Sequence, residues 1–155
     1  MHLDRETFRS VVAHAPLVSL DLVVRNTAGE ILLGRRLNRP ARGYWFVPGG
    51  RIFKNERLDD AFRRITRAEL GQSFPRSDAR LLDLYEHFYD DSVFGPQPDT
   101  HYVVAGYLLD LPEGLTLSLP DTQHNEFRWW DPDEMRSDES VHDNSRAYLA
   151  ATDRR

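Results

Sequence analysis

The sequence contains no cysteine, no long hydrophobic run and no internal repeat. Without cysteine the chain forms no disulfide and offers no thiolate, so any bound metal must be held by oxygen or imidazole ligands. No segment approaches the roughly 18 consecutive apolar residues of a membrane span, and the N-terminus has no signal-peptide pattern. We therefore expect a cytoplasmic protein that does not act at a membrane.

Charge is distributed unevenly along the chain: basic residues outnumber acidic ones up to residue 80, acidic residues dominate afterwards, and the net charge is -5. Five arginines gather in one segment: Arg35, Arg36, Arg39, Arg42 and Arg51. A local cluster in an acidic chain favours a small phosphorylated ligand over a nucleic acid, which requires a broad basic surface. For the cluster alone, a solvated arginine-rich loop fits equally well.

Hydrophobic periodicity and turn residues predict several strands around a few helices. Helices are expected over 4–13, 56–70 and 144–151, and strands over 17–24, 31–33, 44–47, 81–89, 101–109 and 127–130. Asn55 is the expected N-cap of the central helix, and Gly71 its C-terminal stop. Because strands and helices do not alternate regularly, we expect one α/β domain over 1–155, with a mixed β-sheet sandwiched between helices rather than a Rossmann sheet.

The central helix carries a carboxylate near its apolar face. At 100° per residue, Leu58, Phe62 and Ile65 share one stripe, and Glu69 falls about 20° from Leu58. A carboxylate that faces a core is costly unless a cation or several donors meet it. The spacing alone therefore fits a metal ligand and a structural ion pair about equally well.

The residues around this helix match a known motif. The Nudix box, G-x5-E-x7-R-E-U-x-E-E-x-G-U with U a bulky aliphatic residue, is matched by Gly50, Glu56, Arg64, Glu69 and Gly71. Agreement at five spaced positions after a strand-like segment is a strong signal. The chain therefore resembles the Nudix family, which implies a Nudix fold.

Four positions depart from the box. Ile65 and Ala68 stand in place of two glutamates, and Thr66 and Gln72 in place of two aliphatic residues. Nudix enzymes that cleave pyrophosphates use the missing carboxylates for several metal ions and often for the base. Either the fold is inactive here, or it performs chemistry that needs less metal and takes its base from elsewhere.

Segments over nearly the whole chain resemble one Nudix subfamily, the GDP-mannose mannosyl hydrolases. The segments are 16–21, 38–41, 43–51, 68–71, 87–91, 101–104, 123–124 and 144–148. Ala68 followed by Glu69, in place of two glutamates, is itself a mark of that subfamily. The resemblance implies a homodimer that hydrolyses GDP-mannose, or a related GDP-hexose, to GDP and free sugar. It also implies water attack at the anomeric carbon with inversion, and one Mg²⁺ per subunit that Mn²⁺ can replace.

The same resemblance implies a metal site and a base. Glu69, the Gln123 side chain and the backbone carbonyl of Gly49 would hold the metal. His124 follows Gln123 directly and would activate water, since imidazole titrates close to neutral pH. Without the resemblance, both loop residues would more often be solvated and inactive.

A substrate site is implied as well. Arg36 and Arg51 would clamp the diphosphate and assist catalysis, because guanidinium presents paired donors to phosphate oxygens. Asp21, His87 and Tyr102 would surround the sugar and phosphates. Alternatively, His87 is a core imidazole with its hydrogen bonds satisfied, and Tyr102 is an ordinary aromatic residue of a strand. Asp21 interrupts an otherwise apolar strand, which is costly without a partner.

The guanine would lie near the N-terminus by the same resemblance. His2, Leu3 and Phe8 would help line its site, although Phe8 equally fits plain helix packing. The three tryptophans, Trp45, Trp129 and Trp130, we assign to the core.

Two other functions stay open. An ordinary Nudix pyrophosphohydrolase would cleave a nucleoside diphosphate derivative at phosphorus, and Ile65 and Ala68 argue against it. A non-catalytic sugar-nucleotide-binding protein would have no need of a base such as His124. The choice between mannose, glucose and fucose is also open, because it depends on pocket hydrogen bonds that one sequence does not reveal.

Overall fold

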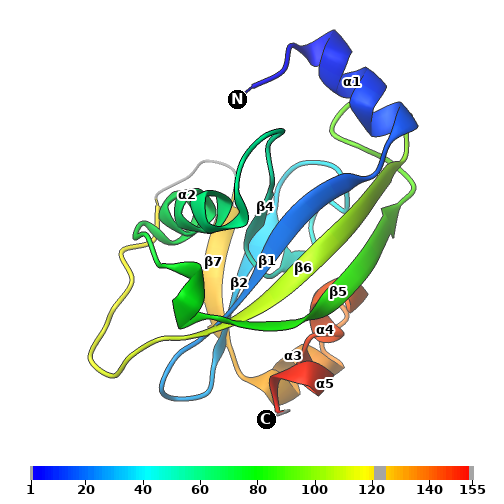
Figure 1. Cartoon of the computed structure of the whole chain (residues 1–155). Coiled ribbons are helices and arrows are strands. Elements are labelled where there is room, and N and C mark those ends of the chain that lie inside the picture. The colour runs from blue at the N-terminus through cyan, green and yellow to red at the C-terminus, as the bar shows by residue number, and fades with distance from the viewer. Residues whose placement is uncertain (1, 121–124, 154–155) are drawn as a thin grey trace.

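The computed structural model of the chain describes residues 2–120 and 125–153, and its centre is a seven-stranded sheet (Figure 1). The strands are β1 (Leu17–Arg25), β2 (Ile31–Arg36), β3 (Trp45–Phe46), β4 (Gly49–Arg51), β5 (Arg80–Tyr89), β6 (Thr100–Asp110) and β7 (Asn125–Trp130). Their order is β3-β2-β1-β6-β5, while β4 also pairs with β1 and β7 with β2. Among the strand pairs of the described residues, only β1 and β6 run parallel, so the sheet is mixed.

Helices cover both faces of this sheet: α2 (Leu58–Leu70) lies on one face, and α3 (Pro132–Ser137), α4 (Asp143–Arg146) and α5 (Leu149–Thr152) lie on the other (Figure 1). Helix α1 (Arg5–His14) lies beyond the end of β1, and a 3-10 turn spans Arg76–Asp78. One core lies between α2 and the sheet, around Phe62, and a second lies between the sheet and α3 to α5, around Trp130. The predicted mixed sheet between helices is confirmed. Among the helices of the described residues, none has the length and apolar character needed to span a membrane.

Strand β1 lies inside the sheet, between two strands that pair with it around Asp21. It pairs with β6 on one side and with β4 on the other, and Asp21 is aligned with Gly106 in β6 and with Gly49 in β4. The cross-strand neighbours of Asp21 are thus both glycines, so no side chain stands beside this acidic residue on either neighbouring strand.

The start of the central helix differs from the prediction. Helix α2 begins at Leu58 rather than at residue 56, and its N-cap is Arg57, which makes no side-chain capping bond. Asn55 is not the cap: it adopts a positive φ of 67° in the preceding turn. Glu56 stays outside the helix because its carboxylate accepts hydrogen bonds from the Phe53 amide and the Arg64 guanidinium.

Two further expectations on helices were wrong. Leu58 is 44% exposed, because α2 contacts the core through its later turns, where Phe62 and Ile65 are buried. The predicted helix over 144–151 is two short helices, α4 and α5. The chain tightens between them, where the Tyr148 amide donates to the Ser145 carbonyl three residues earlier. Ala147 and Tyr148, which join the two helices, keep right-handed helical backbone angles.

The three tryptophans differ in how deeply they are buried. Trp130 is 1% exposed in the core beside α3, as predicted. Trp45 and Trp129 are half-buried and pack against the two cores from outside. Their assignment to the core therefore holds in full for Trp130 alone.

The end of α2 generates a stability prediction. Gly71 has a φ of 78°, and a Cβ at this position would collide with the Ser118 carbonyl oxygen, whereas Gly114, at a φ of 80°, has nothing within 4 Å of its added Cβ. Alanine at either site carries the positive-φ cost of about 1 kcal/mol. Gly71→Ala should therefore lower the free energy of unfolding by at least about 1 kcal/mol more than Gly114→Ala in urea denaturation. Equal losses would show that no backbone is packed against the end of α2.

Candidate active site

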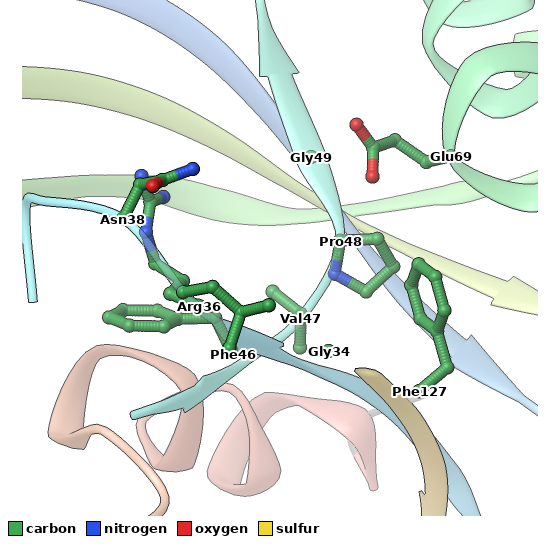
Figure 2. Close-up of a pocket in the computed structure, with 10 residues that line it drawn as sticks. Gly34, Arg36, Asn38, Phe46, Val47, Pro48, Gly49, Glu69 and Phe127 are labelled. Carbon is green, nitrogen blue, oxygen red and sulfur yellow. The ribbon is translucent and has the colours of Figure 1, made fainter. Parts of the chain in front are cut away.

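Two adjoining cavities share the side chains or backbone of Arg36, Phe46, Val47 and Gly49, and together they form one cleft. The first, of about 220 Å³, is lined in addition by Gly34, Leu37, Asn38, Pro48, Glu69 and Phe127 (Figure 2). The second, of about 110 Å³, is lined in addition by Ser19, Asp21, Gly50, Arg51, His87, Tyr89 and Tyr102. We refer to these as the Glu69 end and the Asp21 end of the cleft.

Most of the predicted site residues meet in this cleft. Its lining includes Asp21, Arg36, Gly49, Arg51, Glu69, His87 and Tyr102. His2, Leu3 and Phe8 do not line it, and Gln123 and His124 lie outside the described residues. Side chains from β1, β2, β4, α2, β5 and β6, far apart in the sequence, therefore surround one space.

Two glycines allow β4 to pass closely between β1 and α2. A Cβ on Gly49 would overlap the Asp21 carboxylate, and a Cβ on Gly50 would come within 3.1 Å of Ile65. The absence of side chains lets the main chain of β4 approach both elements. The main chain at Gly49 consequently lines the cleft between Glu69 and Asp21.

Glu69 reaches from α2 toward the Gly49 segment, opposite Arg36 (Figure 2). Its side chain makes no hydrogen bond or ion pair within the described part of the chain. Burial raises the pKa of Glu69 to about 7, and only the positive charge of Arg36 acts in the opposite direction. A half-buried carboxylate that has no partner among the described residues offers the oxygen ligands that Mg²⁺ prefers. Within residues 2–120 and 125–153, however, no group of three or more His, Asp or Glu is arranged to hold a metal.

The other acidic residue of the box, Glu56, is engaged elsewhere. Arg64 Nε donates to Glu56 Oε2 at 2.7 Å and Arg64 Nη2 to Oε1 at 2.9 Å, while Nη2 also reaches the Arg51 carbonyl at 2.8 Å. This two-point ion pair lowers the pKa of Glu56. Glu56 and Arg64 thus fasten the loop after β4 to α2, and the pair leaves Glu69 as the α2 carboxylate in the cleft.

Asp21 occupies the other end of the cleft. Tyr148 donates a hydrogen bond of 2.6 Å to its Oδ2 atom. Burial raises the pKa of Asp21 to about 7, against the lowering effects of that hydrogen bond and of Arg36, and the charge of Glu69 raises it further. The partner that Asp21 requires on physical grounds is therefore a tyrosine 127 residues away, which no local pattern in the sequence indicates.

Both predicted arginine clamps are left without an anionic partner in the described residues. The Nε atom of Arg36 is buried with no hydrogen-bond partner there, and its guanidinium lies 5.8 Å from the Phe46 ring centre. The guanidinium of Arg51 lies 4.7 Å from the centre of the Phe8 ring and 5.2 Å from the centre of the Phe53 ring. Two unpaired guanidinium groups facing one cleft suit an anionic ligand.

His87 and Tyr102 are neutral groups at the Asp21 end. His87 is 6% exposed, and its Nε2 atom has no hydrogen-bond partner among the described residues. Burial lowers the pKa of His87 to about 4, with a smaller contribution from the charge of His142. Burial also raises the pKa of Tyr102. At neutral pH both side chains can therefore exchange hydrogen bonds with uncharged hydroxyl groups of a ligand.

The N-terminal residues predicted to hold the guanine lie beside the cleft. Phe8 contacts Arg51 on one side and the Phe94 ring, 5.7 Å away, on the other. His2 is exposed, with its ring 6.1 Å from that of Phe53, and Leu3 is half-buried. Phe8 thus packs within the chain and also adjoins a cleft arginine, so both interpretations of this residue remain in place.

The segment with the predicted ligand Gln123 and the predicted base His124 precedes β7. Asn125 is aligned with Arg36 in the ladder between β7 and β2, and Phe127 lines the Glu69 end of the cleft. The chain therefore enters β7 directly beside the cleft. The positions of Gln123 and His124 themselves stay predictions.

Several lining residues were not predicted from the sequence: Ser19, Phe46, Tyr89 and Phe127. Tyr89 and Ser19 stand two residues from His87 and Asp21 on their strands, so strand alternation could have indicated them. Tyr89 also accepts a hydrogen bond of 3.2 Å from Asn144, which ties α4 to β5. Phe46 stacks on His142, with ring centres 4.6 Å apart, a contact without any sequence signal.

Comparison with known proteins agrees with the box and with the fold. The NUDIX domain family matches residues 15–151. The low-salt glycan biosynthesis protein Agl8 of Haloferax volcanii is 40% identical over 148 residues, covering 96% of this chain and 89% of that protein.

Solved structures give the same result. A MutT NUDIX hydrolase from Burkholderia pseudomallei is similar with a TM-score of 0.70 and 26% identity, covering 89% of this chain and 98% of that one. The NUDIX domain of Shewanella oneidensis NrtR, solved with ADP ribose, has a TM-score of 0.67 at 17% identity, covering 97% and 92%. The latter likeness is one of fold alone. The chain therefore belongs to the Nudix hydrolase family.

Proposed function

We propose that this chain hydrolyses GDP-mannose, or a closely related GDP-hexose, to GDP and free sugar, with water attacking the anomeric carbon and inverting it. Cleavage at phosphorus would require the carboxylate cluster that other Nudix enzymes build on α2. Cleavage at carbon requires charge neutralisation of a departing diphosphate and one base for water. Arg36, Arg51 and Glu69 in the cleft support the charge neutralisation, and the base, His124, comes to the proposal from the subfamily resemblance.

The observation that carries this proposal is the number of carboxylates that α2 brings to the cleft. Ile65, where the box has a glutamate, is buried in the core, and Ala68, where it has another, has no carboxylate. Glu56 is held by Arg64. Glu69 alone of these four positions lines the cleft, which suits one metal ion and not several.

In the proposed reaction the side chains divide the substrate between them. Arg36 and Arg51 bind the diphosphate, and Asp21, His87 and Tyr102 contact the hexose hydroxyls. Glu69, the Gly49 carbonyl and Gln123 would hold one Mg²⁺, which would neutralise charge on the diphosphate as it departs. His124 would take the proton from the attacking water on the face of the sugar opposite the GDP.

The Haloferax relative supports a nucleotide sugar as the substrate. The name of that protein assigns it to glycan biosynthesis, and nucleotide sugars are the donors from which glycans are built. A hydrolase of the kind proposed here would limit the supply of such a donor. Nothing in the relative's name indicates GDP or mannose, which come to this proposal from the subfamily resemblance.

The proposal includes a homodimer, with His2, Leu3 and Phe8 near the guanine. The edge strand β5 exposes Leu81, Leu84 and Phe88, at 51%, 65% and 64%. Exposed apolar residues on an edge strand are normally covered by association. A second copy of the chain would provide that cover.

Product analysis tests the proposed function. GDP-mannose, GDP-glucose and GDP-fucose are incubated with the protein and Mg²⁺, and the nucleotides are separated by anion-exchange chromatography. GDP and the free hexose are expected in equal amounts. GMP with hexose phosphate would identify a pyrophosphohydrolase instead, and binding without turnover would identify a non-catalytic sugar-nucleotide-binding protein.

The proposed metal site generates a second prediction. Glu69→Gln removes the ligand charge but keeps the side-chain volume, so the Mg²⁺ concentration for half-maximal activity should rise at least about tenfold, with little change in the melting temperature. Glu113→Gln, at an exposed residue that lies outside β5 and does not line the cleft, is the matched control and should leave this concentration unchanged. Gln123→Ala should act as Glu69→Gln does. Unchanged metal dependence in both variants would remove the site from the proposal.

A further inference from the structure

Tyr148 donates a side-chain hydrogen bond to Asp21, and the packing of its ring against neighbouring residues fixes its position. The side chain is 1% exposed, and its ring stands edge-on to Tyr85 with ring centres 4.6 Å apart. It lies over Gly106, where an added Cβ would come within 2.6 Å of the Tyr148 Cε1 atom. Because Gly106 is the neighbour of Asp21 in the β1–β6 ladder, a missing side chain there lets the hydroxyl reach Oδ2 of Asp21.

When Asp21 is ionised, it and Arg36 carry opposite charges and line the same end of the cleft, yet no ion pair joins them. The salt bridges within the described part of the chain involve neither residue, and Arg36 Nε is buried without a partner. A carboxylate and a guanidinium in one poorly solvated space gain strongly by pairing. Some constraint therefore keeps them apart.

We propose that Tyr148 is a positioning residue that holds the Asp21 carboxylate away from Arg36, so that both groups stay available to a ligand. One oxygen of Asp21 is tied to the tyrosine hydroxyl, and the other lies on the Gly49 side. A neutral donor orients the carboxylate without neutralising it. If Asp21 were paired with Arg36, the ligand would first have to break that pair, which would weaken binding.

The inference rests on the proposed function in one respect, since it takes the ligand of Arg36 to be a diphosphate. Tyr148→Phe is the appropriate variant, because it removes one oxygen and keeps the ring that packs on Gly106 and Tyr85. The matched control is Tyr107→Phe. Tyr107 is also a buried tyrosine of the interior, at 4% exposure, but it lies in the core beneath α2 and does not line the cleft.

The first measurement is a crystal structure of ligand-free Tyr148→Phe. The Asp21 carboxylate is expected to turn so that an oxygen lies within about 4 Å of an Arg36 guanidinium nitrogen. A carboxylate that keeps its position without the hydroxyl would overturn the inference. This result does not depend on which substrate the protein uses.

The second measurement is the affinity for GDP with Mg²⁺, by isothermal titration calorimetry. Tyr148→Phe should weaken GDP binding about tenfold, the order of one charge-assisted hydrogen bond, whereas Tyr107→Phe should not change it. The double variant Tyr148→Phe/Asp21→Asn should regain wild-type affinity or better, because a neutral amide at position 21 cannot capture Arg36. A purely structural role for Tyr148 predicts no such recovery.

The two measurements also separate this inference from the proposed function. Failure of the wild-type protein to bind GDP would contradict the proposed function, and the ligand-free structure would still decide the role of Tyr148. GDP binding that is equally tight in wild type and Tyr148→Phe would overturn the inference alone. Weakened binding without recovery in the double variant would also overturn it.

Discussion

The close passage of β4 between β1 and α2 is the constraint on which the site depends. At Gly49 the chain is so near Asp21 that no side chain fits, and at Gly50 it rests on Ile65. This packing places the carboxylate-bearing positions Asp21 and Glu69 on the two sides of one backbone segment. The Arg64 guanidinium fixes the same segment from the far side by bonding Glu56 and the Arg51 carbonyl.

The same packing explains why the departures from the Nudix box are compatible with the fold. Ile65 fills the space under Gly50 with apolar volume, where a glutamate would need a cation. The helix then contributes one poorly solvated carboxylate to the cleft, and much of the remaining polar lining is neutral or cationic. Such a lining suits an anionic ligand with hydroxyl groups, which supports the proposal that a bond is broken at a centre other than phosphorus.

Much of the fold and part of the site were predictable from the sequence because they rest on local patterns. Alternation predicted β5 and β6, an apolar run predicted β1, and Gly71 was predicted as the end of α2 because glycine adopts the left-handed conformation of a helix stop. Asn55 was not an N-cap, because the Glu56–Arg64 ion pair determines where the helix begins. The link from Tyr148 to Asp21 was not predictable, since it joins residues 127 positions apart and depends on a glycine of β6, Gly106, beneath the tyrosine ring.

The central claim is that water attacks carbon, and the position of an oxygen label tests it most directly. GDP-mannose is turned over in ¹⁸O-labelled water, and both products are analysed at once by mass spectrometry. The account predicts that the label appears in mannose and not in GDP, and that the sugar first released from the α-linked substrate is the β-anomer by proton NMR. Label in a phosphate group would contradict the account, because it would show attack at phosphorus despite the single α2 carboxylate in the cleft.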